Sequence, residues 1–182
     1  MKDKIVAAGV LPICRRTKRV LLSKRHPHVM YPNSWASWGG KFEKELGDVT
    51  PQDCAKREFW EETRIEERYL FLKQPIHIYE DERVLYYTFI GIFDDEPTPD
   101  ITTEGGLADY AWFGLNELPE PLMPEFEIML NEEMERLNTM IENGVDENEC
   151  QYVNVNQRVM DESHPLSVRK MSFLDLLFKK KQ

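Results

Sequence analysis

Apolar and polar residues follow one another in segments that predict both strands and helices. Residues 5–11 are apolar throughout, which is typical of a strand buried on both faces. Residues 15–18 are polar and predict a turn, and residues 19–23 supply the second arm of a hairpin. A short strand over 36–38 follows. The amino-terminal part of the chain is therefore predicted to form one side of a sheet.

The later part of the chain predicts three more strands and a long helix. Residues 68–81 and 83–93 read as two strands, and residues 109–113 as another. Between 124 and 143 the apolar residues recur at helical spacing, with acidic residues on the other faces. This pattern predicts an amphipathic helix packed against the sheet. Its apolar stripe consists of Phe126, Leu130, Met134, Leu137 and Ile141.

A second helix is predicted to begin at Thr50. Thr50 and Asp53 have the spacing of a capping box, and Pro51 stands at the first helical position. Ala55 and Phe59 share an edge of this helix that can be buried against the sheet. The helix is therefore expected to be well fixed in orientation.

Three glutamates share one face of the same helix. Glu58, Glu61 and Glu62 have the spacing i, i+3, i+4, so their carboxylates lie close together. Such crowding is unfavourable without a positive charge, and a hard cation such as Mg²⁺ or Mn²⁺ takes oxygen ligands. A glutamate-rich face alone is usually only solvated. Here Arg57 on the opposite edge of the patch and the Gly39-Gly40 turn upstream favour a metal site.

These features resemble the Nudix box of Nudix hydrolases. That motif runs Gly, five residues, Glu, seven residues, then Arg-Glu-aliphatic-x-Glu-Glu-x-Gly-aliphatic. Residues 57–65 match its second half, and residues 39–43 resemble its start. The resemblance extends over about residues 4–142. It implies an α/β fold, the Nudix-type α/β/α sandwich with a mixed β-sheet.

The resemblance also implies a chemistry, which is hydrolysis of the diphosphate bond of a nucleoside diphosphate derivative with Mg²⁺ or Mn²⁺ as cofactor. Glu61 or Glu104 is the candidate base, and Arg57 is expected to orient Glu58 or Glu62. The expected metal ligands are Glu58, Glu61, Glu62, the backbone carbonyl of Gly40, and Asp48.

Three residues are candidates for contact with the substrate. Lys41 follows the glycine turn directly and can reach a phosphate. Arg25 belongs to a basic cluster that either attracts phosphate or is simply a charged loop. Trp38, like Trp35, either stacks on a base or packs in the core.

The chain departs from the Nudix motif at Phe59, where an aliphatic residue is usual, and in two further places. The interval from Gly40 to Arg57 is three residues longer than in the family, and the position of the first motif glutamate falls on Leu46 or Val49. Asp48 is the best substitute, with Glu45 and Glu43 behind it. The late motif glycine is Arg64, so the helix is expected to end differently, because a side chain disfavours a left-handed cap.

Composition narrows the function classes. With 182 residues, 41% hydrophobic, the chain suits one domain with a sizeable core. A net charge of −10 argues against charge-driven binding of double-stranded nucleic acid but leaves a nucleotide substrate open. Three cysteines without metal-site spacing indicate reduced thiols and a cytoplasmic protein. Neither a signal peptide nor a membrane span is expected.

The domain prediction divides the chain into residues 1–143, the Nudix domain, and residues 144–182, an extension. Its apolar segment, 166–178, is expected to dock on the domain or at a homodimer contact. Two other functions remain open. One is a non-catalytic Nudix domain that binds nucleotides or RNA. The other is an enzyme of the isopentenyl diphosphate isomerase type, for which Cys54 is poorly placed.

Overall fold

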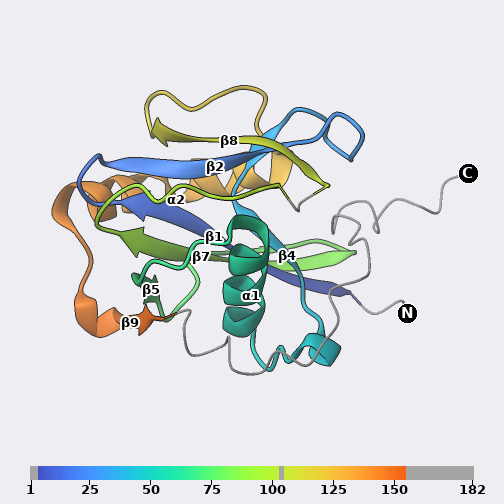
Figure 1. The fold of residues 1–182 in the computed structure, drawn as a ribbon, viewed down its shortest axis with the longest axis horizontal. Coiled ribbons are helices and arrows are strands. Elements are labelled where there is room, and N and C mark those ends of the chain that lie inside the picture. The colour runs from blue at the N-terminus through green and yellow to red at the C-terminus, as the bar shows by residue number, and fades with distance from the viewer. Residues whose placement is uncertain (1–3, 103–104, 155–182) are drawn as a thin grey trace, which may run out of the picture.

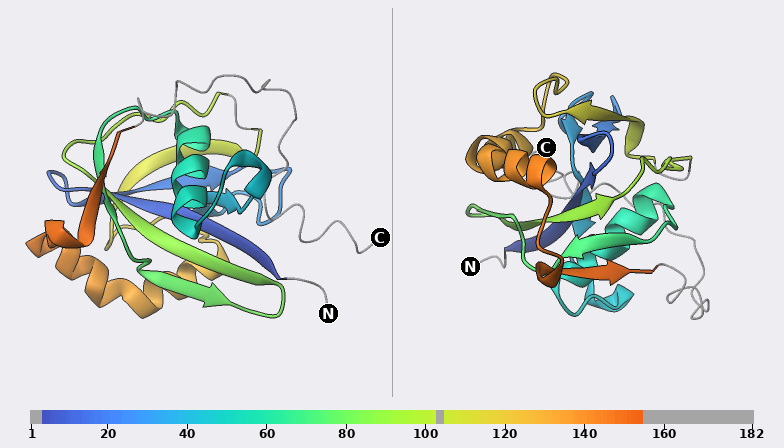
Figure 2. Two further views of the ribbon diagram at one scale, coloured as in Figure 1. Left: turned by 90° about the horizontal axis from the view of Figure 1, so that it is seen from below. Right: turned by 90° about the vertical axis from the view of Figure 1, so that its left-hand side faces the viewer.

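A mixed β-sheet lies between two α-helices in the computed structural model, which describes residues 4–102 and 105–154 (Figure 1). Helix α1 (Pro51–Thr63) covers one face of the sheet, and α2 (Pro124–Asn143) covers the other. Two further views show the helices on opposite sides (Figure 2). The predicted α/β/α sandwich with a mixed sheet is confirmed.

The centre of the sheet is a parallel pair, β1 (Ile5–Cys14) and β7 (Val84–Phe93), in register over ten residues each. On its other side β1 pairs first with β4 (Trp38–Lys41) and then with β2 (Arg19–Arg25). Pro12 pairs with Gly91 of β7 and lies between the residues of β1 that pair with β4 and those that pair with β2. The strand continues through this proline, beyond the predicted end at residue 11.

The remaining strands complete the sheet around this pair. Residues 68–81, predicted as one strand, form two, β5 (Tyr69–Leu72) and β6 (His77–Glu80), and both pair with β7. Strands β3 (Trp35–Ala36) and β8 (Leu107–Gly114) pair with β2. Strand β9 (Cys150–Val153), which no pattern predicted, pairs with β5 at the edge.

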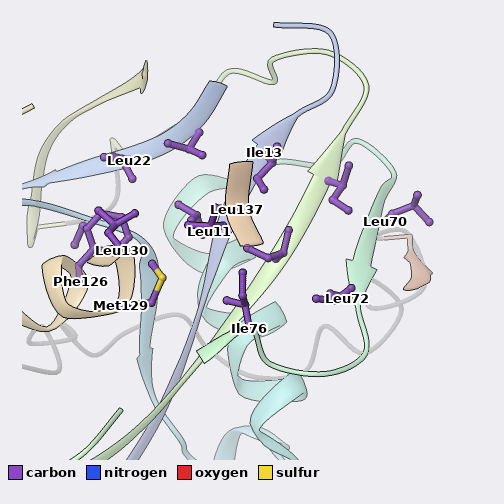
Figure 3. Close-up of a cluster of buried hydrophobic side chains, with 14 of the residues drawn as sticks. Leu11, Ile13, Leu22, Leu70, Leu72, Ile76, Phe126, Met129, Leu130 and Leu137 are labelled. Carbon is purple, nitrogen blue, oxygen red and sulfur yellow. The ribbon is translucent and has the colours of Figure 1, made fainter. Parts of the chain in front are cut away.

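Each face of the sheet has its own hydrophobic core. Alternate residues of a strand point to opposite faces, so Ala8 and Val10 of β1 lie toward α1, whereas Leu11 and Ile13 lie toward α2. The α2 side includes the predicted stripe residues Phe126, Leu130 and Leu137 (Figure 3). The prediction that this helix packs against the sheet is confirmed.

The end of α2 at Asn143 coincides with the predicted domain boundary, yet the chain continues through a short helical turn (Glu147–Glu149) into β9. The apolar segment 166–178 lies outside the described residues, so its docking stays a prediction. Among the described residues, none of the helices combines the length and the apolar character needed to span a bilayer.

Candidate functional site

The start of α1 is fixed by its own sequence. The Thr50 hydroxyl accepts a hydrogen bond from the Asp53 amide, and the Asp53 carboxylate accepts one from the Thr50 amide, which is the predicted capping box. Burial alone would raise the pKa of Asp53, but its hydrogen bonds with Thr50 lower it overall. An ionised acid in the first helical turn also interacts favourably with the helix dipole.

The inner face of α1 anchors the helix on the sheet. Cys54, Ala55 and Phe59 are buried, and the Phe59 ring meets Trp38 edge-on with centroids 6.3 Å apart. Such aromatic pairs add to the stabilisation from burial. Because this packing fixes the orientation of α1 on the sheet, the neighbouring face with the glutamates has a defined position.

The end of α1 corrects one prediction. Arg64 adopts the left-handed conformation of the cap, with φ of 53°, and its amide donates to the Trp60 carbonyl at 2.8 Å. The helix therefore keeps the left-handed cap that the motif glycine would form. The arginine side chain makes this conformation less stable by roughly 1 kcal/mol. The Arg64 guanidinium lies over the Trp60 ring, 4.4 Å from its centroid, a contact that offsets part of this cost.

Arg57 is the centre of the candidate site. Its Nε and Nη2 donate to the two carboxylate oxygens of Asp48 at 2.9 and 2.7 Å, and its Nη1 donates to Glu58 at 2.7 Å and Glu61 at 3.1 Å. Nη2 also donates to the Lys41 carbonyl. Burial alone would lower the pKa of Arg57, but Asp48 and Glu58 raise it overall, so the guanidinium stays charged. Arg57 thus contacts Glu58 and Glu61, and its role in orienting the glutamates for the reaction stays a prediction.

Asp48 occupies a different place from the one expected. It is 4% exposed, and both of its oxygens accept hydrogen bonds from Arg57. A further bond from the Glu43 amide to Asp48 Oδ2 holds it from the other side. This geometry favours Asp48 as the anchor of Arg57 over the predicted role as metal ligand.

The three inserted residues explain how Asp48 reaches Arg57. The loop forms a single helical turn (Lys44–Leu46) that closes on Gly47, whose φ of 91° suits glycine. Leu46 and Val49, where the motif places its first glutamate, are exposed, whereas Asp48 between them is buried. The lengthened loop therefore carries Asp48 inward to Arg57.

The glycine turn lies directly against the helix carboxylates. A Cβ atom on Gly40 would lie 2.5 Å from the Glu58 carboxyl carbon, so only glycine permits this approach. The amide of Gly39 donates to Glu62 Oε2 at 2.8 Å. Glu58 and Glu62 therefore both meet the turn, and the Glu61 side chain is 24% exposed, compared with 10% for Glu58.

Two candidates for substrate contact are corrected by burial. Trp38 is 0% exposed, and its indole N–H donates to the Leu21 carbonyl, so it belongs to the core. Arg25 is 8% exposed, and its Nε donates to the Met30 carbonyl at 2.6 Å, which closes the loop after β2. Lys41 follows Gly40 and is half-buried, so its contact with phosphate stays a prediction. Glu104 lies outside the described residues.

Tyr86 joins the site although the sequence placed it only in a strand. A Cβ atom on Gly39 would lie 2.6 Å from its hydroxyl oxygen, which also bonds to the Ser37 side chain. Burial, followed by the charge of Glu62, raises the pKa of Tyr86 far above its usual range. Nothing in the strand pattern indicates this position, because it depends on the registers of β7 and β4 against β1, the strand between them.

Cys54 lies beneath the turn and is buried. Its thiol contacts the Gly40 carbonyl at 3.6 Å, and burial raises its pKa far above its usual range. A buried, protonated thiol does not suit the entrance cysteine that the isomerase alternative requires.

The donor chemistry of the site suits a hard cation, because the glutamates and the glycine carbonyl offer oxygen. Glu58 and Glu61 already converge on one positive nitrogen, Arg57 Nη1. Within residues 4–102 and 105–154, however, no three His, Cys, Asp or Glu side chains are arranged to hold a metal as they stand.

Replacing Gly40 with alanine is expected to lower kcat/KM for the reaction proposed below by about tenfold or more, because the added Cβ displaces the Glu58 carboxylate. Gly144→Ala is a suitable control. It places a side chain at the end of α2 on a residue with φ of 81° and ψ of −175°, a conformation that essentially only glycine adopts, with open space around it. Each variant should lose about 1–3 kcal/mol of stability, so an equal loss of activity in both would contradict the role of Gly40.

Comparisons with family models and with solved structures point to the same family. The model of the NUDIX domain matches residues 3–132. No curated protein sequence matches the chain. Among solved structures, a MutT NUDIX hydrolase from Burkholderia pseudomallei is similar with a TM-score of 0.54 and 21% identity, over 71% of this chain and 98% of that one.

Two further similar structures contain ligands. The NUDIX domain of Shewanella oneidensis NrtR, complexed with ADP ribose, has a TM-score of 0.58 and 17% identity over 75% of this chain and 90% of that one. A bifunctional NMN adenylyltransferase/ADP ribose pyrophosphatase from Francisella tularensis, complexed with AMP and a Mn ion, has a TM-score of 0.53 and 19% identity. The similarity covers 75% of this chain and 43% of that one. At these identities the likeness establishes the fold.

Proposed function

We propose a function on the premise that this chain belongs to the NUDIX family, whose domain model covers most of its length. The chain is a Nudix-type pyrophosphohydrolase, and its substrate is a nucleoside diphosphate derivative. The observation that carries this proposal is the carboxylate cluster that Arg57 and the Gly39-Gly40 turn hold together. The ADP ribose and the AMP bound to two proteins of the same fold support a nucleotide substrate.

The proposed cofactor is Mg²⁺ or Mn²⁺, held by Glu58, Glu61 and Glu62 with the Gly40 carbonyl. The Mn ion in a protein of the same fold supports a divalent metal. When bound, such an ion supplies positive charge at the phosphates and lowers the pKa of a coordinated water. Arg57 carries one positive charge, whereas the three glutamates and Asp48 carry several negative charges. The excess negative charge favours binding of a divalent cation.

The chain's own groups have distinct tasks in this proposal. Glu61 takes the proton of the attacking water, since its side chain is 24% exposed and therefore more accessible than those of Asp48 and Glu58, the other carboxylates paired with Arg57. The water oxygen bonds to one phosphorus, and the bridging oxygen leaves with the other phosphate. Arg57 is a positioning residue that holds Glu58 and Glu61, and Lys41 attracts the phosphate groups. Glu104 is the alternative base.

The direct test is hydrolysis of a substrate panel. The panel contains nucleoside triphosphates, ADP ribose, dinucleoside polyphosphates and capped RNA, each with Mg²⁺ or Mn²⁺, and the products are identified by mass spectrometry. We expect a mononucleotide product with metal and background rates after chelation with EDTA, because the carboxylates then repel the phosphates.

Excess Mg²⁺ should restore the rate, and circular dichroism should show that EDTA leaves the chain folded. Equal hydrolysis with and without metal would contradict the metal site. Tight nucleotide binding by a folded protein that cleaves nothing in the panel would favour the non-catalytic alternative.

A further inference from the structure

The face of the sheet that carries α1 becomes open to solvent beyond the helix. Helix α1 packs mainly on β1 and β4, and it touches β7 much less. Figure 1 shows the amino-terminal end of β1 extending past the helix. Close to α1 this face is fully buried, at Ala8 and Val10 of β1 and at Phe89 of β7. Farther along the same strands, away from α1, this cover is lost.

The side chains on this uncovered part are apolar, although a solvated sheet face usually carries polar residues. Because alternate residues of a strand share a face, Val6 of β1 and Leu85 and Tyr87 of β7 lie on the α1 side. Ile78 of β6 lies directly opposite Tyr87 and shares that face. Val6, Leu85 and Tyr87 are half-buried, and Ile78 is 51% exposed. We call these four residues the open strip.

The loop that leads into α1 begins at the open strip. The amide of Phe42 donates to the Val6 carbonyl at 2.9 Å, which fixes the start of the loop beside β1. Two large apolar side chains of this loop, Leu46 and Val49, are 43% and 82% exposed. Apolar side chains are thus exposed both on the strip and on the loop beside it. Groups of exposed apolar residues, unlike single ones, mark interaction surfaces.

The carboxy-terminal part of the chain has the composition to cover this surface. Residues 166–178, which lie outside the described residues, contain eight large apolar side chains among thirteen. Contact with water is unfavourable for these side chains and for the strip alike. Burying one against the other contributes roughly 25 cal/mol for each Å² of apolar surface removed from water.

Charge favours the same pairing. Residues 155–182 carry six basic and three acidic side chains, whereas the whole chain has a net charge of −10. Three of the basic residues, 179–181, are lysines that directly follow the apolar segment. Asp81 and Glu82 are exposed acids in the turn between β6 and β7, at one end of the strip. An apolar segment on the strip can therefore place its lysines near these acids.

The chain is long enough to reach the strip from its last described strand. Strand β9 pairs with β5, and β5 and β6 follow one another along the edge of β7 that faces away from β1. Strand β5 is level with Ile92 of β7 and β6 with Tyr87, five residues away, which is about 17 Å along the strand. Residues 155–165 connect β9 to the apolar segment, and eleven residues span up to about 36–40 Å when extended.

The connection also favours the chain's own segment over that of a second copy. A short tether holds a segment at an effective concentration on the order of millimolar, well above the usual concentration of a protein in solution. We propose that residues 166–178 dock on the open strip of their own chain and cover Ile78 and Tyr87. The following lysines then lie toward Asp81 and Glu82. This inference is independent of the proposed function, because the docking requires neither a nucleotide nor a metal.

The first test maps the contact in the full chain by photo-crosslinking. The crosslinker p-benzoylphenylalanine replaces Ile78, and the irradiated protein is digested and analysed by mass spectrometry. We expect crosslinks from this position to residues within 166–178. As a matched control, the same crosslinker replaces Ile128, which is 39% exposed on α2 at the opposite face of the sheet, and should not reach the segment. A mixture of chains with natural and heavy nitrogen separates contacts within one chain from contacts between two copies.

The second test leaves the described residues unchanged, so it remains decisive if the crosslinker at Ile78 impairs folding. Hydroxyl-radical footprinting measures how fast Tyr87 is oxidised in the wild type and in a Leu174→Asp, Leu177→Asp double variant. Burying these two charges is unfavourable, so the variant segment should leave the strip and the oxidation rate should rise at least about twofold. Ser163→Asp is the control, since it adds a charge outside the segment and should keep the wild-type rate.

The outcomes decide the proposal. Crosslinks to 166–178 within one chain and faster oxidation of Tyr87 in the double variant support it. Crosslinks only between natural and heavy chains show that a second copy occupies the strip and overturn it. A folded Ile78 variant that gives no crosslink to the segment, or an oxidation rate of Tyr87 that the double variant leaves unchanged, also overturns it. None of these results bears on hydrolysis, which the substrate panel tests separately.

Discussion

Replacing Glu62 with glutamine is expected to reduce kcat/KM at least about a hundredfold, with little change in stability. The amide oxygen of glutamine can still accept the hydrogen bond that Gly39 donates to Glu62 at 2.8 Å, so the turn keeps its contact. The negative charge is lost, and with it one oxygen ligand for a divalent cation. Removing one electrostatic contributor from an active site typically costs about 10²- to 10³-fold in rate.

The same substitution at Glu61 is expected to have an effect of similar size, because Glu61 loses both its charge and its ability to take a proton. Initial rates with the best substrate of the panel, over a range of Mg²⁺ concentrations, measure both variants. A loss that high Mg²⁺ partly restores indicates a metal ligand, whereas a loss that Mg²⁺ leaves unchanged indicates the base.

Glu66→Gln is the matched control, since Glu66 is an exposed glutamate just beyond the end of α1. It should retain the wild-type rate. Wild-type rates in both Glu61→Gln and Glu62→Gln would show that the metal assignment is wrong.

The largest expected loss of stability follows from Arg57→Ala. This change leaves the buried carboxylates of Asp48 and Glu58 without the guanidinium that now lies 2.7 Å from each. Removing one partner of a buried ion pair typically costs about 3–5 kcal/mol, because the remaining charge stays in a poorly solvated place. Urea unfolding followed by circular dichroism should therefore show a lower midpoint with a similar slope.

A matched pair on the surface provides the control. Arg16 lies 2.7 Å from Asp95, the same separation, but its side chain is 71% exposed. Arg16→Ala should therefore cost about 1 kcal/mol or less. Equal and small losses in the two variants would contradict the structural role of Arg57, and a double-mutant cycle with Asp48→Ala would measure their coupling.

Much of the fold follows from local patterns. The capping box at Thr50, the buried edge of α1 and the apolar stripe of α2 depend on residues a few positions apart, and the structure has each where the sequence predicts it. The face shared by Glu58, Glu61 and Glu62 is equally a property of helical spacing. Strand β9 was missed, because a four-residue edge strand is defined by its partner β5 rather than by its own pattern.

The candidate site likewise combines features that follow from local spacing with features that depend on tertiary contacts. By itself, the sequence determined the helix, its three glutamates, the neighbouring arginine and the glycine turn, because their spacing is local. Only the tertiary structure decided that Asp48 faces Arg57, that Trp38 is buried, and that Arg64 keeps the left-handed cap. It also brought Tyr86 to Gly39 and Glu125 to Tyr31, residues that are far apart in the chain. Such contacts depend on strand register and on the conformation of loops. Neither can be inferred from the hydrophobic periodicity of a single segment.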